Sequence, residues 1–209
     1  MPSPIIHLEI LYQLAKQQNM ELDPDLIQGV ISPDAIHMRA NQTWEDKSKT
    51  HYYKLADESY FLALEKAKNE LRKTTKAFTL GYLIHLYTDY FWRETIYTPF
   101  FMLRKEEMPR QDLHALYYKQ MQQLDYAILK DATWIKKAQN SLDEVTFKGN
   151  FKHLTQQEIN QWSSKVVEND LKVVGEGLNL HYPKLFPKPL IEAFNNEILT
   201  ELADWISKI

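Results

Sequence analysis

Gly81-Tyr82-Leu83-Ile84-His85-Leu86-Tyr87-Thr88-Asp89-Tyr90-Phe91-Trp92 is a largely apolar run that contains one histidine, one aspartate and no other charged residue. Such a run predicts a buried helix, and residues i and i+4 share one face of a helix, so His85 and Asp89 point the same way. A buried polar group without a partner costs about 1–3 kcal/mol. A bound metal would supply that partner, because imidazole and carboxylate both bind zinc. The alternative is a single His–Asp hydrogen bond within the core.

More candidate ligands precede this run. Ser32-Pro33-Asp34 predicts a turn that presents Asp34, and His37 follows three residues later. His51 comes after a polar segment, and His7 lies one turn from the apolar residues of the first predicted helix. Four of the seven histidines thus fall in the first half beside apolar or acidic residues, which favours one shared site over scattered surface positions.

The order of these residues resembles that of the bacterial zinc-dependent phospholipase C family, whose all-helical fold is shared by P1/S1-type nucleases. The resemblance covers roughly residues 1–95, and it is closest to a bacterial branch without a signal segment that carries Pro-Asp-Ala-Ile-His, here residues 33–37. It implies a zinc cluster bound by an aspartate, a histidine, an HxxxD pair and a histidine near the N-terminus. The implied metal ligands are His7, Asp34, His51, His85 and Asp89.

The chain also departs from the family pattern. The family follows its HxxxD motif with a proline and a histidine and supplies a later HxxxE helix, whereas Trp92-Arg93-Glu94 follows here and no HxxxE occurs. We therefore expect one or two zinc ions rather than three, although manganese and iron accept the same ligand types. Glu94 and Asp125 are the nearest substitutes, as an extra metal ligand or a base.

The expected chemistry is hydrolysis of a phosphate ester by metal-activated water. Asp89 would bridge two ions, and Asp34 or Glu94 would take the proton. His37, Arg39 and Arg93 are candidates to bind the substrate, since a guanidinium group matches phosphate geometry. The alternative function is a catalytically reduced binding or regulatory module on the same scaffold. A di-iron bundle is disfavoured because its ExxH pairs are absent.

Composition restricts the remaining functions. The chain has 209 residues, five glycines and no cysteine, which excludes disulfides and thiolate metal sites. The formal net charge of −3 gives no basic surface for duplex nucleic acid. No secretory signal and no apolar run of about 18 residues occurs, so we expect a cytoplasmic protein without a membrane span that acts on a small phosphorylated substrate. The substrate could be a lipid, nucleotide or sugar phosphate, and the oligomeric state stays open.

Helical periodicity extends along nearly the whole chain and predicts one all-α domain over residues 1–209, with the metal ligands within about 1–130 and further helices over 131–209. Residues 39–50 are polar and are predicted to form a loop, and Pro99 is expected to interrupt the segment after Trp92. About seven helices are expected, over residues 4–18, 23–29, 51–73, 75–92, 109–130, 155–175 and 190–206.

Overall fold

The computed structural model describes residues 1–172 and 178–208, and every regular element within them is helical. The all-α prediction is therefore confirmed. The elements are α1 (Pro4–Gln18), α2 (Pro24–Ile31), the 3-10 helix η1 (Ser32–Met38), α3 (Trp44–Thr50), α4 (Tyr53–Ala56), α5 (Tyr60–Glu70), α6 (Lys76–Trp92), the π-helical turn η2 (Arg93–Tyr97), α7 (Thr98–Arg104), α8 (Arg110–Asp131), α9 (Ile135–Glu144), α10 (Gln156–Lys165), the π-helical turn η3 (Val166–Asp170) and α11 (Lys188–Ile206).

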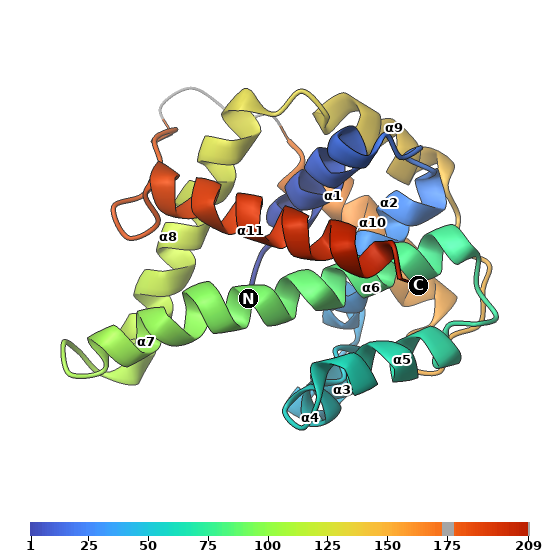
Figure 1. Ribbon diagram of the computed structural model, residues 1–209, viewed down its shortest axis with the longest axis horizontal. Coiled ribbons are helices and arrows are strands. Elements are labelled where there is room, and N and C mark those ends of the chain that lie inside the picture. The colour runs from blue at the N-terminus through green and yellow to red at the C-terminus, as the bar shows by residue number, and fades with distance from the viewer. Residues whose placement is uncertain (173–177, 209) are drawn as a thin grey trace.

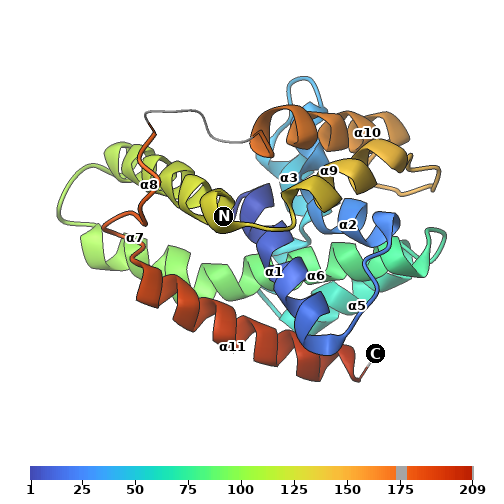
Figure 2. The ribbon, with the colours of Figure 1, turned by 90° about the horizontal axis from the view of Figure 1, so that it is seen from above.

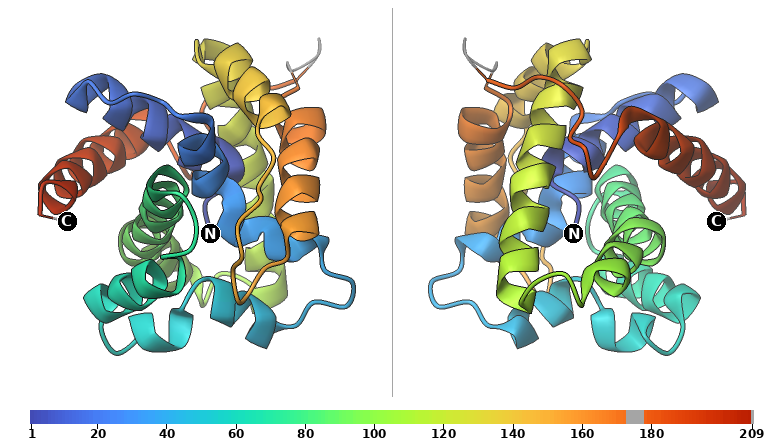
Figure 3. Two further views of the ribbon diagram at one scale, coloured as in Figure 1. Left: turned by 90° about the vertical axis from the view of Figure 1, so that its right-hand side faces the viewer. Right: turned by 90° about the vertical axis from the view of Figure 1, so that its left-hand side faces the viewer.

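Helix α6 runs through the middle of the molecule, with α11 above it and α3, α4 and α5 below it in Figure 1. Seen from above, α1 lies between α11 and α2 (Figure 2). The two end views show α3 to α5 gathered at the bottom of the molecule, away from α9 (Figure 3). Helix α6 contacts α1, α2, α5 and α11, and its buried apolar side chains belong to the main hydrophobic cluster. Among the described residues, no helix combines the length and apolar character needed to cross a bilayer.

Several helix starts follow from capping residues that the sequence displays. The side chains of Ser3 and Thr75 accept hydrogen bonds from the backbone at the starts of α1 and α6. Asp23 caps α2 in the same way, with proline next to it. Thr155 and Glu158 form a capping box at the start of α10. These caps satisfy backbone N–H groups that would otherwise be unpaired at a helix start.

Two glycines bring α2 and α6 into backbone contact. A Cβ atom on Gly81 would lie 2.2 Å from the carbonyl oxygen of Leu26, and one on Gly29 would lie 2.3 Å from that of Phe78. Any larger residue at either position would push the helices apart. This close approach places the carbonyl group of Val30, at the end of α2, against the imidazole of His85 on α6.

The segment before α5 differs from the prediction. The expected loop over 39–50 is wrong for its second half, because Thr43 and Asp46 form a capping box that starts α3. The expected long helix over 51–73 is also wrong. His51 ends α3, Tyr52 takes a left-handed conformation with φ of 53°, and Ser59 caps a new helix, α5. A non-glycine residue with positive φ stops a helix, so His51 is held at a helix end.

Other boundaries also moved, and the helices outnumber the seven expected. Asp34 lies in η1 rather than in a simple turn. Pro99 does not end the helical segment, because α6, η2 and α7 follow one another without a break and the π-helical turn η2 lies directly before it. The region between the helices predicted over 109–130 and 155–175, where no helix is expected, contains α9. The helix expected to reach residue 175 is described as far as Asp170, and its predicted end lies outside the described residues.

Candidate metal centre

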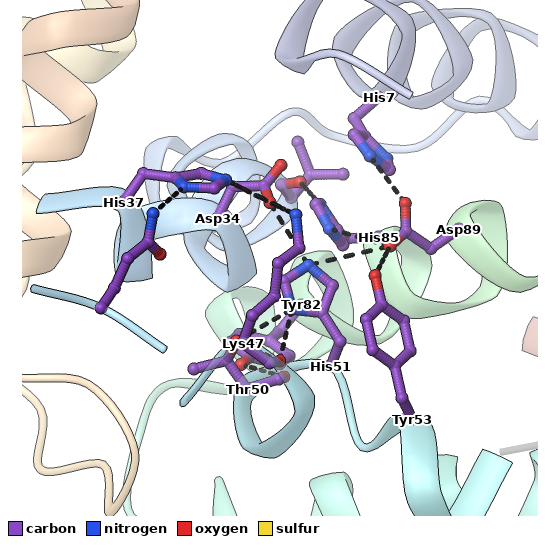
Figure 4. Close-up of polar contacts among 12 residues, drawn as sticks. His7, Asp34, His37, Lys47, Thr50, His51, Tyr53, Tyr82, His85 and Asp89 are labelled. Carbon is purple, nitrogen blue, oxygen red and sulfur yellow. Dashed lines mark hydrogen bonds and ion pairs between the residues drawn. The ribbon is translucent and has the colours of Figure 1, made fainter. Parts of the chain in front are cut away.

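Five side chains from four parts of the chain converge beside α6 (Figure 4). They form two overlapping groups that share His85, and within each group the candidate ligand atoms lie within 4.8 Å of one another. No third such group occurs in residues 1–172 and 178–208. The ligand cluster consists of His7 on α1, Asp34 on η1, His51 at the end of α3, and His85 and Asp89 on α6.

Asp89 faces both groups. Its Oδ1 lies 3.5 Å from Nε2 of His7, while its Oδ2 lies 3.7 Å from Nε2 of His51 and 4.0 Å from Nε2 of His85. Asp34 lies across the cluster, with its Oδ1 3.3 Å from Nε2 of His51. Asp89 thus belongs to the group with His7 and His85, and its Oδ2 also faces His51 of the other group.

Backbone carbonyl groups fix the imidazoles of His85 and His51. Nδ1 of His85 donates to the carbonyl oxygen of Val30 at 2.8 Å, and Nδ1 of His51 lies 3.1 Å from the carbonyl oxygen of Lys47. A carbonyl oxygen only accepts hydrogen bonds, so Nδ1 carries the proton in His85 and the lone pair of that ring is on Nε2. Nδ1 of His51 also lies 2.8 Å from the hydroxyl oxygen of Thr50. The Nε2 atoms of both rings point into the cluster. This outer hydrogen bond is typical of histidines that bind metal.

The cluster contains polar atoms that the described protein leaves without hydrogen-bond partners. They are Nδ1 and Nε2 of His7, Nε2 of His51, Nε2 of His85 and Oδ1 of Asp89. These five are half of the ten such buried side-chain atoms among the described residues. Each would cost about 1–3 kcal/mol if left unsatisfied. Cations held by the two groups would satisfy four of these atoms, so the residues present fit a bound metal.

The protonation states of the cluster also suit metal binding. Burial raises the pKa of Asp34, but the ammonium group of Lys47 and the facing imidazoles outweigh this and hold it well below its usual value. Burial also raises the pKa of Asp89, but the imidazoles of His7, His85 and His51 outweigh this effect and hold the pKa below its usual value. Burial lowers the pKa of His85 to about 3. At neutral pH the cluster therefore offers ionised carboxylates and an unprotonated His85, which are the forms that bind metal.

Two residues at the cluster were not identified from the sequence. Lys47 places its Nζ 3.4 Å from Oδ1 of Asp34, and the carboxylates of Asp34 and Asp89 raise its pKa despite the opposing effect of burial. Tyr53 donates from its hydroxyl group to Oδ2 of Asp89 at 3.1 Å. Recognising the Thr43 capping box would have placed Lys47 four residues before His51 on one helix. No sequence signal identifies Tyr53.

The three expected substrate residues lie in different surroundings. Nε2 of His37 is 3.6 Å from Oδ1 of Asp34, and the side chain is 36% exposed. Arg93 lines a small cavity with His51, Tyr53 and Asp89, but its Nη1 donates to Asp57. The guanidinium group of Arg39 points to other partners. It binds Glu158 through two nitrogens and also donates to Asp46 and to the carbonyl oxygen of His153.

Glu94 and Asp125 do not join the ligand cluster. Glu94 is 54% exposed and pairs with Arg93. Asp125 on α8 accepts a hydrogen bond from the hydroxyl group of Ser3 and lines a cavity of about 350 Å³ with Met1 and Ser3. Burial raises the pKa of Asp125 to about 7. Neither carboxylate belongs to a group of mutually close ligands.

Comparison with known families places this geometry in context. The sequence model of the family described as zinc dependent phospholipase C matches residues 6–166. The chain belongs to this family. The match includes every member of the ligand cluster and extends through α10. No curated protein and no solved structure matches the chain.

Family membership and the ligand set together identify Zn²⁺ as the cofactor. The donors are imidazole nitrogen and carboxylate oxygen, which are the usual zinc ligands in a protein without cysteine. The family is one of metal-dependent hydrolases, and the buried cluster of histidine and aspartate fits that chemistry.

Proposed function

We propose that the protein hydrolyses a phosphate ester at the ligand cluster. The observation that carries the proposal is the convergence of Nε2 atoms from His7, His51 and His85 on the carboxylate of Asp89, without hydrogen bonds of their own. When bound there, zinc supplies an activated water at neutral pH and stabilises charge on a phosphoryl oxygen. The expected substrate is small and phosphorylated.

Each residue of the ligand cluster has a role of its own. His7, His51 and His85 hold the ions, and Asp89 lies between the two groups, which supports one or two ions. Asp34 has the more exposed carboxylate, with a side chain that is 10% exposed against 4% for Asp89. We assign Asp34 to the open side of the cluster, where it binds metal and orients the attacking water.

A single variant tests the proposal. Protein purified without chelator or nickel resin should contain one or two equivalents of zinc per chain and should cleave bis(p-nitrophenyl) phosphate. Asp89→Asn should lose most of the zinc and the activity while its circular dichroism stays helical. Asp143→Asn, an exposed aspartate on α9, is the matched control and should behave as the wild type.

The outcomes separate the proposal from its rival. Full activity in Asp89→Asn would overturn the assignment of the site. A wild-type protein that binds zinc tightly but cleaves neither phosphodiesters nor phosphomonoesters would favour a binding or regulatory module on the same scaffold. Protein that neither contains zinc nor takes it up on titration would overturn both the cofactor and the hydrolase assignment.

A further inference from the structure

Lys47 is the charged neighbour of the ligand cluster that the proposed mechanism does not use. Its Nζ lies 3.4 Å from Oδ1 of Asp34 and 3.5 Å from Nε2 of His37 (Figure 4). Among ion pairs of the described residues, this is the one that joins a lysine or arginine to a carboxylate of the cluster. A half-buried ammonium group beside a metal ligand weakens cation binding unless it has another purpose.

We propose that the ammonium group of Lys47 binds a phosphoryl oxygen of the substrate at the open side of the metal centre. The inference rests on the proposed function, because it assigns one substrate contact of that same site. Lysine commonly binds phosphate as a point charge. An ammonium group has three donors. One of them faces Asp34 and a second lies within 3.5 Å of Nε2 of His37, which leaves the third for a phosphoryl oxygen.

The exposure of the side chains shows where the site opens. The imidazoles of His7, His51 and His85 are fully buried, whereas Lys47 is 21% exposed and the neighbouring His37 is 36% exposed. A ligand approaching from solvent on this side meets Lys47 and His37 before it reaches the imidazoles. The position of Lys47 therefore matches a group that meets substrate rather than one that only fills the core.

The two arginines expected to bind phosphate are engaged elsewhere. Arg39 uses Nε, Nη1 and Nη2 on Glu158, Asp46 and a carbonyl group. Arg93 donates to Asp57 and lies 3.5 Å from a carboxylate oxygen of Glu94. The charge on each guanidinium group is thus balanced by carboxylates of its own, while Lys47 lies at the cluster itself.

The charge of the site defines the substrate class. Asp34 and Asp89 contribute two negative charges and Lys47 contributes one positive charge, with the imidazoles neutral as metal binding requires. Adding one Zn²⁺ gives the site a net charge of about +1. An anionic phosphoryl group neutralises that charge, and Lys47 lies where such a group would enter.

Binding of inorganic phosphate to zinc-loaded protein tests the proposal without relying on turnover. Lys47→Gln should bind phosphate about 10- to 100-fold more weakly than the wild type, the range expected for losing one charged hydrogen bond, with unchanged zinc per chain. Lys47→Arg should recover most of the affinity. Lys49→Gln is the matched control, since Lys49 lies on the same helix and pairs with Glu45 at the surface.

The results distinguish three situations. Equal phosphate affinity in Lys47→Gln and the wild type, measured by titration calorimetry, would overturn the proposal and leave Lys47 as a neutralising partner of Asp34. Tighter zinc binding in Lys47→Gln with unchanged phosphate affinity would overturn it in the same way. Phosphate binding that depends on Lys47 in a protein without esterase activity would uphold this contact while the proposed hydrolysis failed.

Discussion

Two clusters of charged side chains in this protein are completed in opposite ways. In the Arg39 network, formed by Arg39, Asp46, Glu158 and the carbonyl group of His153, Nε, Nη1 and Nη2 of the guanidinium group all donate to oxygen atoms of the chain at 2.8–3.2 Å. In the ligand cluster, the facing atoms stand 3.3–4.0 Å apart and five of them lack hydrogen bonds. The first cluster is completed by the chain alone, and the second requires a cation.

This difference separates charged residues that stabilise the fold from charged residues that serve chemistry. Both clusters contain buried or half-buried carboxylates, so burial alone does not tell them apart. What distinguishes the two clusters is whether each polar atom has a hydrogen-bond partner. Changes in the ligand cluster should therefore act on zinc and activity, and changes in the Arg39 network should act on the free energy of unfolding.

The largest effect is expected for His85→Ala, because both ligand groups share this imidazole. Zinc affinity should fall by more than about 100-fold, since even outer partners of metal ligands cost 10- to 100-fold, and activity should fall with it. Elemental analysis and phosphodiesterase assays measure the two. His181→Ala, at an exposed histidine, is the control. Normal zinc content in His85→Ala would remove the distinction between the clusters.

Acid should weaken the ligand cluster before it reaches the Arg39 network. Burial lowers the pKa of His85 to about 3, whereas a histidine in the unfolded chain titrates near 6.5. As the pH falls below about 6.5 the unfolded chain takes up a proton that the folded chain does not, so folding stability falls. His85 alone should then cost zinc-free protein about 2 kcal/mol between pH 7.5 and 5.0, at about 1.4 kcal/mol per pH unit below 6.5. Asp125, whose pKa burial raises to about 7, opposes this change, because its carboxyl group takes up a proton in the folded chain over the same range.

Urea unfolding of the zinc-free wild type and of zinc-free His85→Ala at the two pH values isolates the His85 contribution, because Asp125 is present in both proteins. Arg39 holds the pKa of Glu158 below its usual value against the opposing effect of burial. The stability that Glu158 contributes is present above its unfolded pKa of about 4.3 and is lost only at lower pH. An equal pH dependence of stability in the wild type and in His85→Ala would contradict the assignment of a buried neutral His85.

Glu158→Gln should have the complementary effect on the Arg39 network. It removes the charge that pairs with Arg39 and weakens the capping box with Thr155. The free energy of unfolding should fall by about 1–2 kcal/mol at pH 7.5, with unchanged zinc content. Glu144→Gln, an exposed glutamate on α9, controls for the loss of a charge. A loss of zinc in Glu158→Gln would show that the two clusters are not independent.

The smallest effect is expected for Tyr53→Phe. The variant removes one hydrogen bond to Oδ2 of Asp89, worth about 0.5–1.5 kcal/mol. Activity should fall by about tenfold or less, while zinc content stays constant. Tyr118→Phe, at an exposed tyrosine, is the control. A loss of zinc in Tyr53→Phe as large as in His85→Ala would mean that the hydroxyl group is essential to the metal centre.

Much of the fold and part of the site follow from local sequence rules. The helical spacing of His85 and Asp89 places both on one face of α6, and the position of His7 relative to the apolar residues of α1 places it in the core. Caps at Ser3, Asp23, Thr75 and Thr155 fix helix starts to within a residue or two. These features depend on neighbours in the sequence, so the sequence alone reveals them.

The remaining features depend on contacts between distant segments. Tyr82 on α6 donates to the carbonyl oxygen of Thr50 and so anchors the residue before His51, a contact that no local pattern predicts. Asp125 has plausible spacing for a ligand, yet α8 presents it to Ser3 instead. Arg39 has a side chain suited to phosphate, but the partners that occupy it come from α3 and from the segment that starts α10.

The contact between Gly29 and Gly81 is a place where a substitution can alter the metal centre without changing any ligand. Alanine at either position must displace α2 from α6, and the carbonyl group that orients His85 moves with α2. Gly29 and Gly81 are thus as necessary to the geometry of the site as the histidines are. A relative that keeps all five ligands but replaces either glycine has a different centre, and a library that randomises α2 should leave both fixed.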